Sequence, residues 1–198
     1  MLSDLTTGLL TGLGLIVAIG AQNAYVLRQG VRRSHVGLVV ALCALSDVVL
    51  ITAGIAGIGV LITGAPWLLV LLRWGGVIYL VWFAISSFRS AARAEALEAD
   101  DAPPAARGVA LTVLALTWLN PHVYLDTVLM LGSVANQHGD GRWWFGLGAM
   151  AASILWFSGL GFGARALAPV LARRRVWQVL DVLIGLVMLL IAAKLALG

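Results

Sequence analysis

The sequence has very few charged residues, which excludes the composition of an ordinary soluble domain. Only 11% of its 198 residues are charged, whereas 61% are hydrophobic. Soluble domains typically carry about 25% charged residues. A lipid bilayer is therefore the expected solvent for this chain, and little of it remains to form a soluble domain.

The chain also has only one cysteine and no basic residue near its amino terminus. Cys43 lies in an apolar run and has no second cysteine with which to form an intramolecular disulfide. A cleavable signal peptide begins with basic residues, yet the first one here is Arg28, after the first apolar stretch. We therefore expect that stretch to be retained as a membrane helix.

Six apolar segments are present, and each is long enough to cross about 30 Å of hydrocarbon, which needs roughly 20 helical residues. The most hydrophilic stretch, about residues 89–108, is predicted to be a cytoplasmic loop. The sequence thus predicts an all-α membrane protein with six transmembrane helices in a single domain, residues 1–198. The predicted spans are about 5–27, 36–63, 67–88, 109–134, 143–163 and 176–197.

The basic residues are clustered between the apolar segments, so the net charge of +4 reflects membrane topology and indicates no nucleic-acid partner. If the amino terminus lies outside, ten of the 13 Lys and Arg residues fall on the cytoplasmic side. Only Arg73, Arg142 and Lys194 fall on the other side. The positive-inside rule therefore predicts that both termini lie outside.

Three aspartates lie within predicted spans, where a charge costs about 2.5–3.5 kcal/mol at the bilayer centre. Asp47 is in the middle of the second span, Asp126 is inside the fourth, and Asp181 is about one turn into the sixth. No basic residue within the spans is an obvious permanent partner. Protonated aspartates that merely hold helices together are one interpretation. We favour a functional role for Asp47 and Asp126 and leave both interpretations open for Asp181.

Two spans contain residues that interrupt a helix. Pro121 lacks the N–H that a helix requires, and its ring displaces Asn120 from helical geometry. In the first span, Gly20 is followed by the polar Gln22 and Asn23. A break in the first helix of each half is typical of transporters built from two inverted three-helix repeats, which we adopt as a hypothesis. An ordinary proline kink is the alternative.

His122 and Asp126 are four residues apart and share a helix face, so a hydrogen bond, a proton relay or half of a metal site could form there. A zinc site usually needs three or four protein ligands, and neither Cys43, His35 nor His138 has suitable spacing. We therefore expect no metal and no cofactor. A polar pair that orients helices remains an alternative to the relay.

Two segments resemble those of a known transporter family. GLGLIVAIGAQNAYVLRQGVRRSHV, followed by ALCALSDVVLI, closely resembles the start of the LysE family of bacterial lysine and arginine exporters, and TWLNPHVYLDT resembles its second characteristic segment. The length, the six apolar segments and the polar middle loop also fit, so the resemblance covers essentially the whole chain. It implies a multi-pass protein of the bacterial inner membrane.

The resemblance also implies which residues form the substrate site. Exporters of neutral amino acids in the wider superfamily typically carry a Lys after the Asn-Pro pair, where this chain has His122. The resemblance therefore favours L-lysine and L-arginine as substrates and leaves neutral amino acids such as homoserine or threonine as the alternative. The residues that match the family's polar positions are Gln22, Asn23, Asp47, Asn120, Pro121, His122 and Asp126.

Export of a cation against an inside-negative potential costs about 2.3 kcal/mol per charge for each 100 mV, so we expect a coupled mechanism. Burial disfavours the charged form of a carboxyl group, whereas a nearby cation favours it. Substrate and proton should therefore compete for Asp47 and Asp126, which predicts proton antiport with alternating access. Asn23 and Asn120 would hold the α-amino and α-carboxylate groups.

A passive channel and an intramembrane enzyme are the rival classes. A channel also needs polar residues inside a bundle, so the sequence does not exclude one. An enzyme is disfavoured because the sequence contains no HExxH motif and no plausible Ser-Lys dyad within the spans. The oligomeric state is not fixed by the sequence, and a homodimer is one option.

Overall fold

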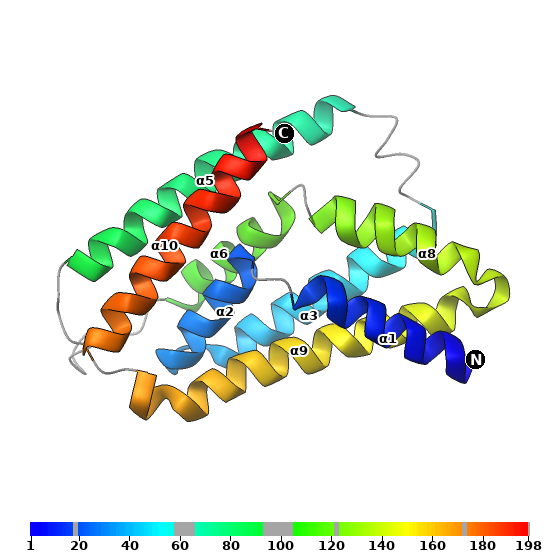
Figure 1. The fold of residues 1–198 in the computed structure, drawn as a ribbon, viewed down its shortest axis with the longest axis horizontal. Coiled ribbons are helices and arrows are strands. Elements are labelled where there is room, and N and C mark those ends of the chain that lie inside the picture. The colour runs from blue at the N-terminus through cyan, green and yellow to red at the C-terminus, as the bar shows by residue number, and fades with distance from the viewer. Residues whose placement is uncertain (18–19, 58–65, 93–104, 121–122, 172–173, 198) are drawn as a thin grey trace.

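The computed structural model describes residues 1–17, 20–57, 66–92, 105–120, 123–171 and 174–197. Within these ranges all regular structure is helical and there is no strand, which confirms the predicted all-α class (Figure 1). The helices are α1 (Leu2–Ile16), α2 (Ala21–Val31), α3 (Val36–Ile55), α5 (Pro66–Ala92), α6 (Ala106–Trp118), η1 (Tyr124–Leu131), α8 (Gly132–Gln137), η2 (Gly139–Gly141), α9 (Arg142–Leu171) and α10 (Arg174–Leu197).

Three stretches of the described chain are long and apolar enough to cross a membrane unaided: α3, residues 139–169 in and before α9, and residues 178–197 of α10. The pair α1 and α2 adds a fourth if it is counted as one broken span. Helix α6 is apolar but shorter. The chain therefore has the helices of a multi-pass membrane protein, while the count of six spans and the inverted repeat stay predictions.

The first apolar segment is divided into two helices. Helix α1 ends at Ile16, α2 begins at Ala21, and their axes differ by 83°. Gly20 precedes α2 in an extended conformation. The last carbonyl groups of a helix have no partner within it, and the Asn23 amide Nδ2 donates to the Ile16 carbonyl at 2.9 Å. Asn23 thus stabilises the break from the α2 side.

The fourth apolar segment is also interrupted. Helix α6 ends at Trp118, and Asn120 lies outside any helix. The backbone then forms the π-helix η1, a rare conformation that is common at functional sites. The Tyr124 hydroxyl donates to the Trp118 carbonyl at 2.8 Å and so connects the two sides of the interruption. Pro121 and His122 lie outside the described residues.

Helix α9 lies along the lower edge of the molecule in Figure 1 and packs against α1, α2 and α3. The backbone of α1 approaches α9 closely at Gly8, which lies against the backbone of Phe145. A Cβ atom on Gly12 would be 3.0 Å from Ala149 Cα. The small residues of α1 therefore allow the backbones of α1 and α9 to approach closely.

Helices α5 and α10 lie side by side and antiparallel (Figure 1). An ion pair joins α10 to α2, with Arg28 Nε 3.5 Å from Asp181 Oδ1. The Asp181 side chain is 0% exposed and that of Arg28 is 11% exposed. The expectation that the intramembrane aspartates lack a basic partner was therefore wrong for Asp181. Arg28 is near the C-terminal end of α2 and Asp181 is near the N-terminal end of α10, and the sequence does not reveal that these two helices are neighbours.

Candidate substrate pocket

The two helix interruptions meet at one pocket. Its cavity of about 240 Å³ suits a small ligand, since pockets for drug-sized ligands occupy roughly 300–1,000 Å³. Apolar and small residues form part of the wall: Leu15, Ile16, Gly20, Ala21, Val123, Phe157 and Ile191. The polar and charged lining residues are Gln22, Asn23, Asp47, Asn120, Asp126, Thr127 and Lys194.

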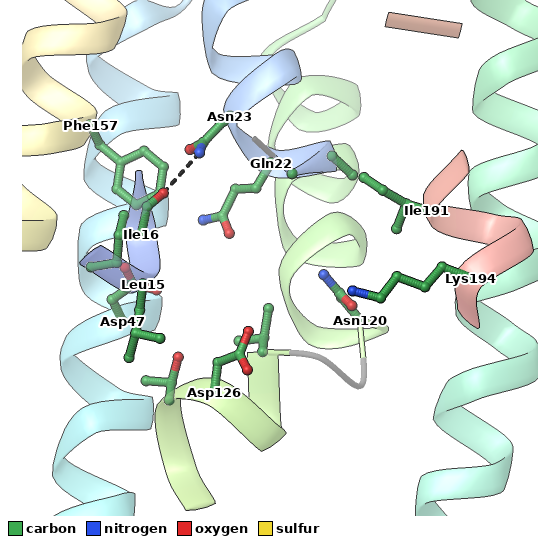
Figure 2. Close-up of a pocket in the computed structure, with 14 residues that line it drawn as sticks. Leu15, Ile16, Gln22, Asn23, Asp47, Asn120, Asp126, Phe157, Ile191 and Lys194 are labelled. Atoms are coloured by element: carbon green, nitrogen blue, oxygen red, sulfur yellow. Dashed lines mark hydrogen bonds between the residues drawn. The ribbon is translucent and has the colours of Figure 1, made fainter. Parts of the chain in front are cut away.

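The structure brings most of the sequence-predicted site residues to this pocket. Gln22 and Asn23 belong to the first turn of α2, directly after Gly20. Asp47 belongs to α3, Asn120 follows α6, and Asp126 belongs to η1. Figure 2 shows the labelled side chains around a common hollow, with Asp47 and Asp126 contributed by different helices. His122 and Pro121, predicted beside Asn120, lie outside the described residues.

Asp47 is held by a residue that the sequence did not single out. Its side chain is enclosed by protein, with 6% of the residue exposed. Ser153 of α9 donates its hydroxyl proton to Asp47 Oδ2 at 2.6 Å. A hydrogen bond to an ionised carboxylate is shorter and stronger than one between neutral groups. Ser153 therefore fixes the orientation of the carboxyl group. In the sequence, Ser153 is distinguished only as a hydroxyl residue within an apolar segment.

Asp126 has a different environment from Asp47. It lies in the first turn of η1, lines the same cavity and is exposed. The next residue, Thr127, also lines the cavity. One carboxyl group of the pocket is therefore enclosed and the other is accessible.

The two neighbouring amide residues of α2 differ in their hydrogen bonding. Asn23 Oδ1 accepts a hydrogen bond from Trp156 Nε1 at 3.2 Å, while its Nδ2 donates to Ile16 as described above. Gln22 Nε2 is buried and has no hydrogen-bond partner within the described residues. A buried donor of this kind costs about 1–3 kcal/mol unless a ligand or water satisfies it. Asn23 is thus committed to the protein framework, whereas Gln22 offers a donor to the cavity.

Lys194 is a charged pocket residue that the sequence analysis did not assign to the site. It lies in the last turn of α10, as its expected place near the end of the sixth span implies. It also lines the cavity, and Figure 2 shows its side chain extending toward Asn120. Lys194 is the only lysine in the sequence, which is the one signal that could have drawn attention to it. The pocket therefore contains charges of both signs.

Comparison with known proteins gives consistent matches over nearly the whole chain. Residues 13–198 match the family model described as LysE type translocator. The chain is 41% identical to the lysine exporter LysE of Corynebacterium diphtheriae, covering 95% of this chain and 96% of the relative. It is 44% identical to the arginine exporter protein ArgO of Salmonella newport, covering 99% and 94%.

A further relative, a putative amino-acid transporter of Mycobacterium tuberculosis, is 46% identical over 90% of this chain and 89% of its own length. No solved structure matches the chain.

Proposed function

Because the chain belongs to the LysE family of translocators, we propose that it exports basic L-amino acids, L-lysine or L-arginine, from the bacterial cytoplasm across the inner membrane. The names of two relatives, a lysine exporter and an arginine exporter, support this substrate class. The long apolar helices support a position within the membrane. Family membership also argues against an enzyme.

The observation that carries the proposal is the position of Asp47 and Asp126 on one cavity between interrupted helices. A cationic amino acid has two positive groups, the α-ammonium and the side chain. Two carboxylates in a protein-lined cavity can pair with both, whereas a neutral amino acid would leave one carboxylate without a cationic partner. An unpaired charge is expensive inside a protein. The pocket therefore favours a dibasic substrate over homoserine or threonine.

The same carboxyl groups provide a route to proton coupling. A cationic substrate favours their ionised form, and its departure favours protonation. In the proposed cycle, cytoplasmic lysine or arginine displaces a proton and the loaded carrier opens outward. An external proton then replaces the substrate. Exchange of one cation for one proton moves no net charge across the membrane, so the membrane potential does not oppose it.

Other lining residues have supporting roles in this proposal. The helix breaks at Gly20 and between α6 and η1 free backbone groups that can bind the amino acid. Asn120 contributes its amide at the second break, and Asn23 holds the first break in place through Ile16 and Trp156. We retain the relay between His122 and Asp126 as part of the proposal.

The proposal includes the larger architecture expected from the sequence. Six spans in two inverted three-helix repeats, with both termini outside, would place the pocket near the middle of the bilayer. Alternating access would then expose it to each side in turn. A homodimer is compatible with this arrangement and is not required by it.

Efflux from proteoliposomes tests this function. Vesicles containing the full-length protein and labelled arginine should release the label faster when the external solution is made acidic. Asp47→Asn and Asp126→Asn should each reduce proton-driven efflux at least tenfold. Asp140→Asn, an exposed aspartate in η2, is the control and should match wild type. Wild-type rates in both pocket variants would refute the assignment.

Counterflow separates a carrier from the passive channel. External arginine should accelerate release of internal labelled arginine from a carrier, because the loaded site returns faster than the empty one. It should have no such effect on a pore. External threonine in the same assay tests the neutral-substrate alternative, and stimulation by threonine equal to that by arginine would contradict the basic-substrate proposal.

A further inference from the structure

The charges of the pocket are arranged on opposite sides. Asp47 lies on α3, while Lys194 enters from α10 on the other side of the hollow (Figure 2). Asp126, which belongs to η1, lies between them in this view. Within the described residues no ion pair joins Lys194 to either aspartate. The Lys194 ammonium is thus not neutralised by an ion pair with either carboxylate of the cavity.

The charge pattern of the pocket matches that of a basic amino acid. Lysine and arginine carry one carboxylate and two cationic groups. The pocket carries one ammonium and two carboxylates. Each charge of the substrate therefore has a partner of opposite sign, and the pairing fixes which end of the molecule faces α10. A diamine or agmatine, which lacks the carboxylate, would leave Lys194 without a partner.

The first turn of α2 supports an anion at the same cavity. Gly20 and Ala21 line the pocket, and Gly20 provides no side-chain cap for the helix. The first N–H groups of a helix lack intrahelical partners and carry a partial positive charge. Together with an ammonium across the cavity, they favour a carboxylate.

The last turn of α10, which carries Lys194, is held by contacts outside the pocket. Arg73 of α5 donates from Nη2 to the Ala196 carbonyl at 2.7 Å, which ties the last turn of α10 to α5. At Gly76, one turn along α5, a Cβ atom would be 2.5 Å from the Leu119 carbonyl oxygen and 3.3 Å from Leu195 Cδ2. Helix α5 therefore packs against both Leu119 and Leu195, which are the sequence neighbours of Asn120 and Lys194.

From this arrangement we infer that Lys194 binds the substrate's α-carboxylate and so restricts transport to α-amino acids with a free carboxylate. The inference rests on the proposed export of lysine and arginine and adds a determinant of specificity. Loss of a hydrogen bond to a charged group weakens binding roughly 10- to 100-fold. Lys194→Gln should therefore raise the KM for arginine by about that factor.

The comparison that tests the inference uses arginine and argininamide, whose carboxylate is replaced by a neutral amide. Wild-type protein should prefer arginine, and Lys194→Gln should remove the preference by impairing arginine transport alone. Lys194→Arg keeps a positive charge at this position and should restore part of the preference for arginine. Arg142→Gln, which removes an exposed positive charge outside the pocket, is the control and should keep the wild-type preference.

An equal loss with both substrates, or no change with either, would overturn the role of Lys194. If wild-type protein transports neither arginine nor lysine, the proposed function itself fails, so the two failures are distinguishable.

A labelling experiment on wild-type protein avoids any folding defect of the variant. Because Lys194 is the only lysine, an amine-reactive reagent has only this side chain and the N-terminal amine to modify, and mass spectrometry of the peptides distinguishes the two. Arginine should slow its modification several-fold more than argininamide does, and equal protection would contradict the inference.

Discussion

Arg28 of α2 and Asp181 of α10 form an ion pair inside the helix bundle, with 3.5 Å between Nε and Oδ1. The guanidinium also lies over the Phe83 ring of α5, 5.8 Å from its centroid. Within the described residues, neither carboxylate oxygen of Asp181 accepts a hydrogen bond. The charge of Arg28 is therefore the main compensation for a fully buried carboxylate, and it connects the α5 and α10 pair to the rest of the molecule.

Arg28→Gln should destabilise the protein by about 3–5 kcal/mol, because it leaves Asp181 buried without its positive partner. The double variant Arg28→Gln with Asp181→Asn should recover most of this loss, since both charges are then absent. Thermal unfolding in detergent would measure the difference. A double variant no more stable than Arg28→Gln would show that the ion pair is not the cause.

Ser153→Ala should weaken arginine binding roughly tenfold while changing the free energy of unfolding much less. The hydroxyl donates to Asp47 at 2.6 Å and favours the ionised carboxylate that pairs with the substrate. The measurement is the KM for arginine in proteoliposomes. Ser133→Ala is the matched control, because the Ser133 hydroxyl is exposed and bonds to the Met130 carbonyl. Equal KM values for Ser153→Ala and wild type would contradict the proposed role of Asp47.

Gly8→Ala should destabilise the protein by about 1–3 kcal/mol, because the added methyl group would overlap the Phe145 backbone of α9. Gly14→Ala lies on the same helix, where a Cβ atom meets nothing within 4 Å. It should be neutral or should stabilise by about 0.5–1 kcal/mol, because alanine restricts the unfolded chain. Midpoints of thermal unfolding compare the two. Similar losses in both variants would mean that the close contact of α1 with α9 is unimportant.

Cysteine labelling should show that the loop at Asp140 lies outside and the start of α6 lies inside. Cys43 is fully buried, so Cys43→Ala provides a background without a competing thiol. Asp140→Cys should react with a membrane-impermeant maleimide in intact cells. Arg107→Cys should react only after permeabilisation. Both positions are exposed. The reverse pattern would refute the predicted orientation.

The sequence indicated part of the pocket because polar residues within apolar segments are conspicuous. Asp47 and Asp126 were noticed because a charge in the bilayer is costly. Gly20 and Asn120 were noticed because glycine and the residue before proline disfavour a regular helix. These signals are local in the sequence, and the structure places all four residues on one cavity.

The other features of the pocket depend on which helices are neighbours, and the neighbours of a helix cannot be deduced from one sequence. Ser153 reaches Asp47 only because α9 packs against α3. Lys194 lines the cavity only because the end of α10 lies beside the break after α6. The π-helical geometry of η1 also has no sequence signature of its own. Apolar helices pack by shape, and many pairings of similar helices satisfy the same hydrophobic pattern.

The cavity wall is built from both halves of the chain, which has a consequence for a protein cut into two fragments. A cut anywhere in residues 93–104 would leave Asp47 and the α1–α2 break on one fragment, and Asp126 with Lys194 on the other. Neither fragment alone would carry both of the carboxylates that we propose for the two cationic groups of the substrate. Transport by such a split protein would require the two pieces to assemble within the same bilayer, so co-expression of both fragments is the minimum condition for recovering activity.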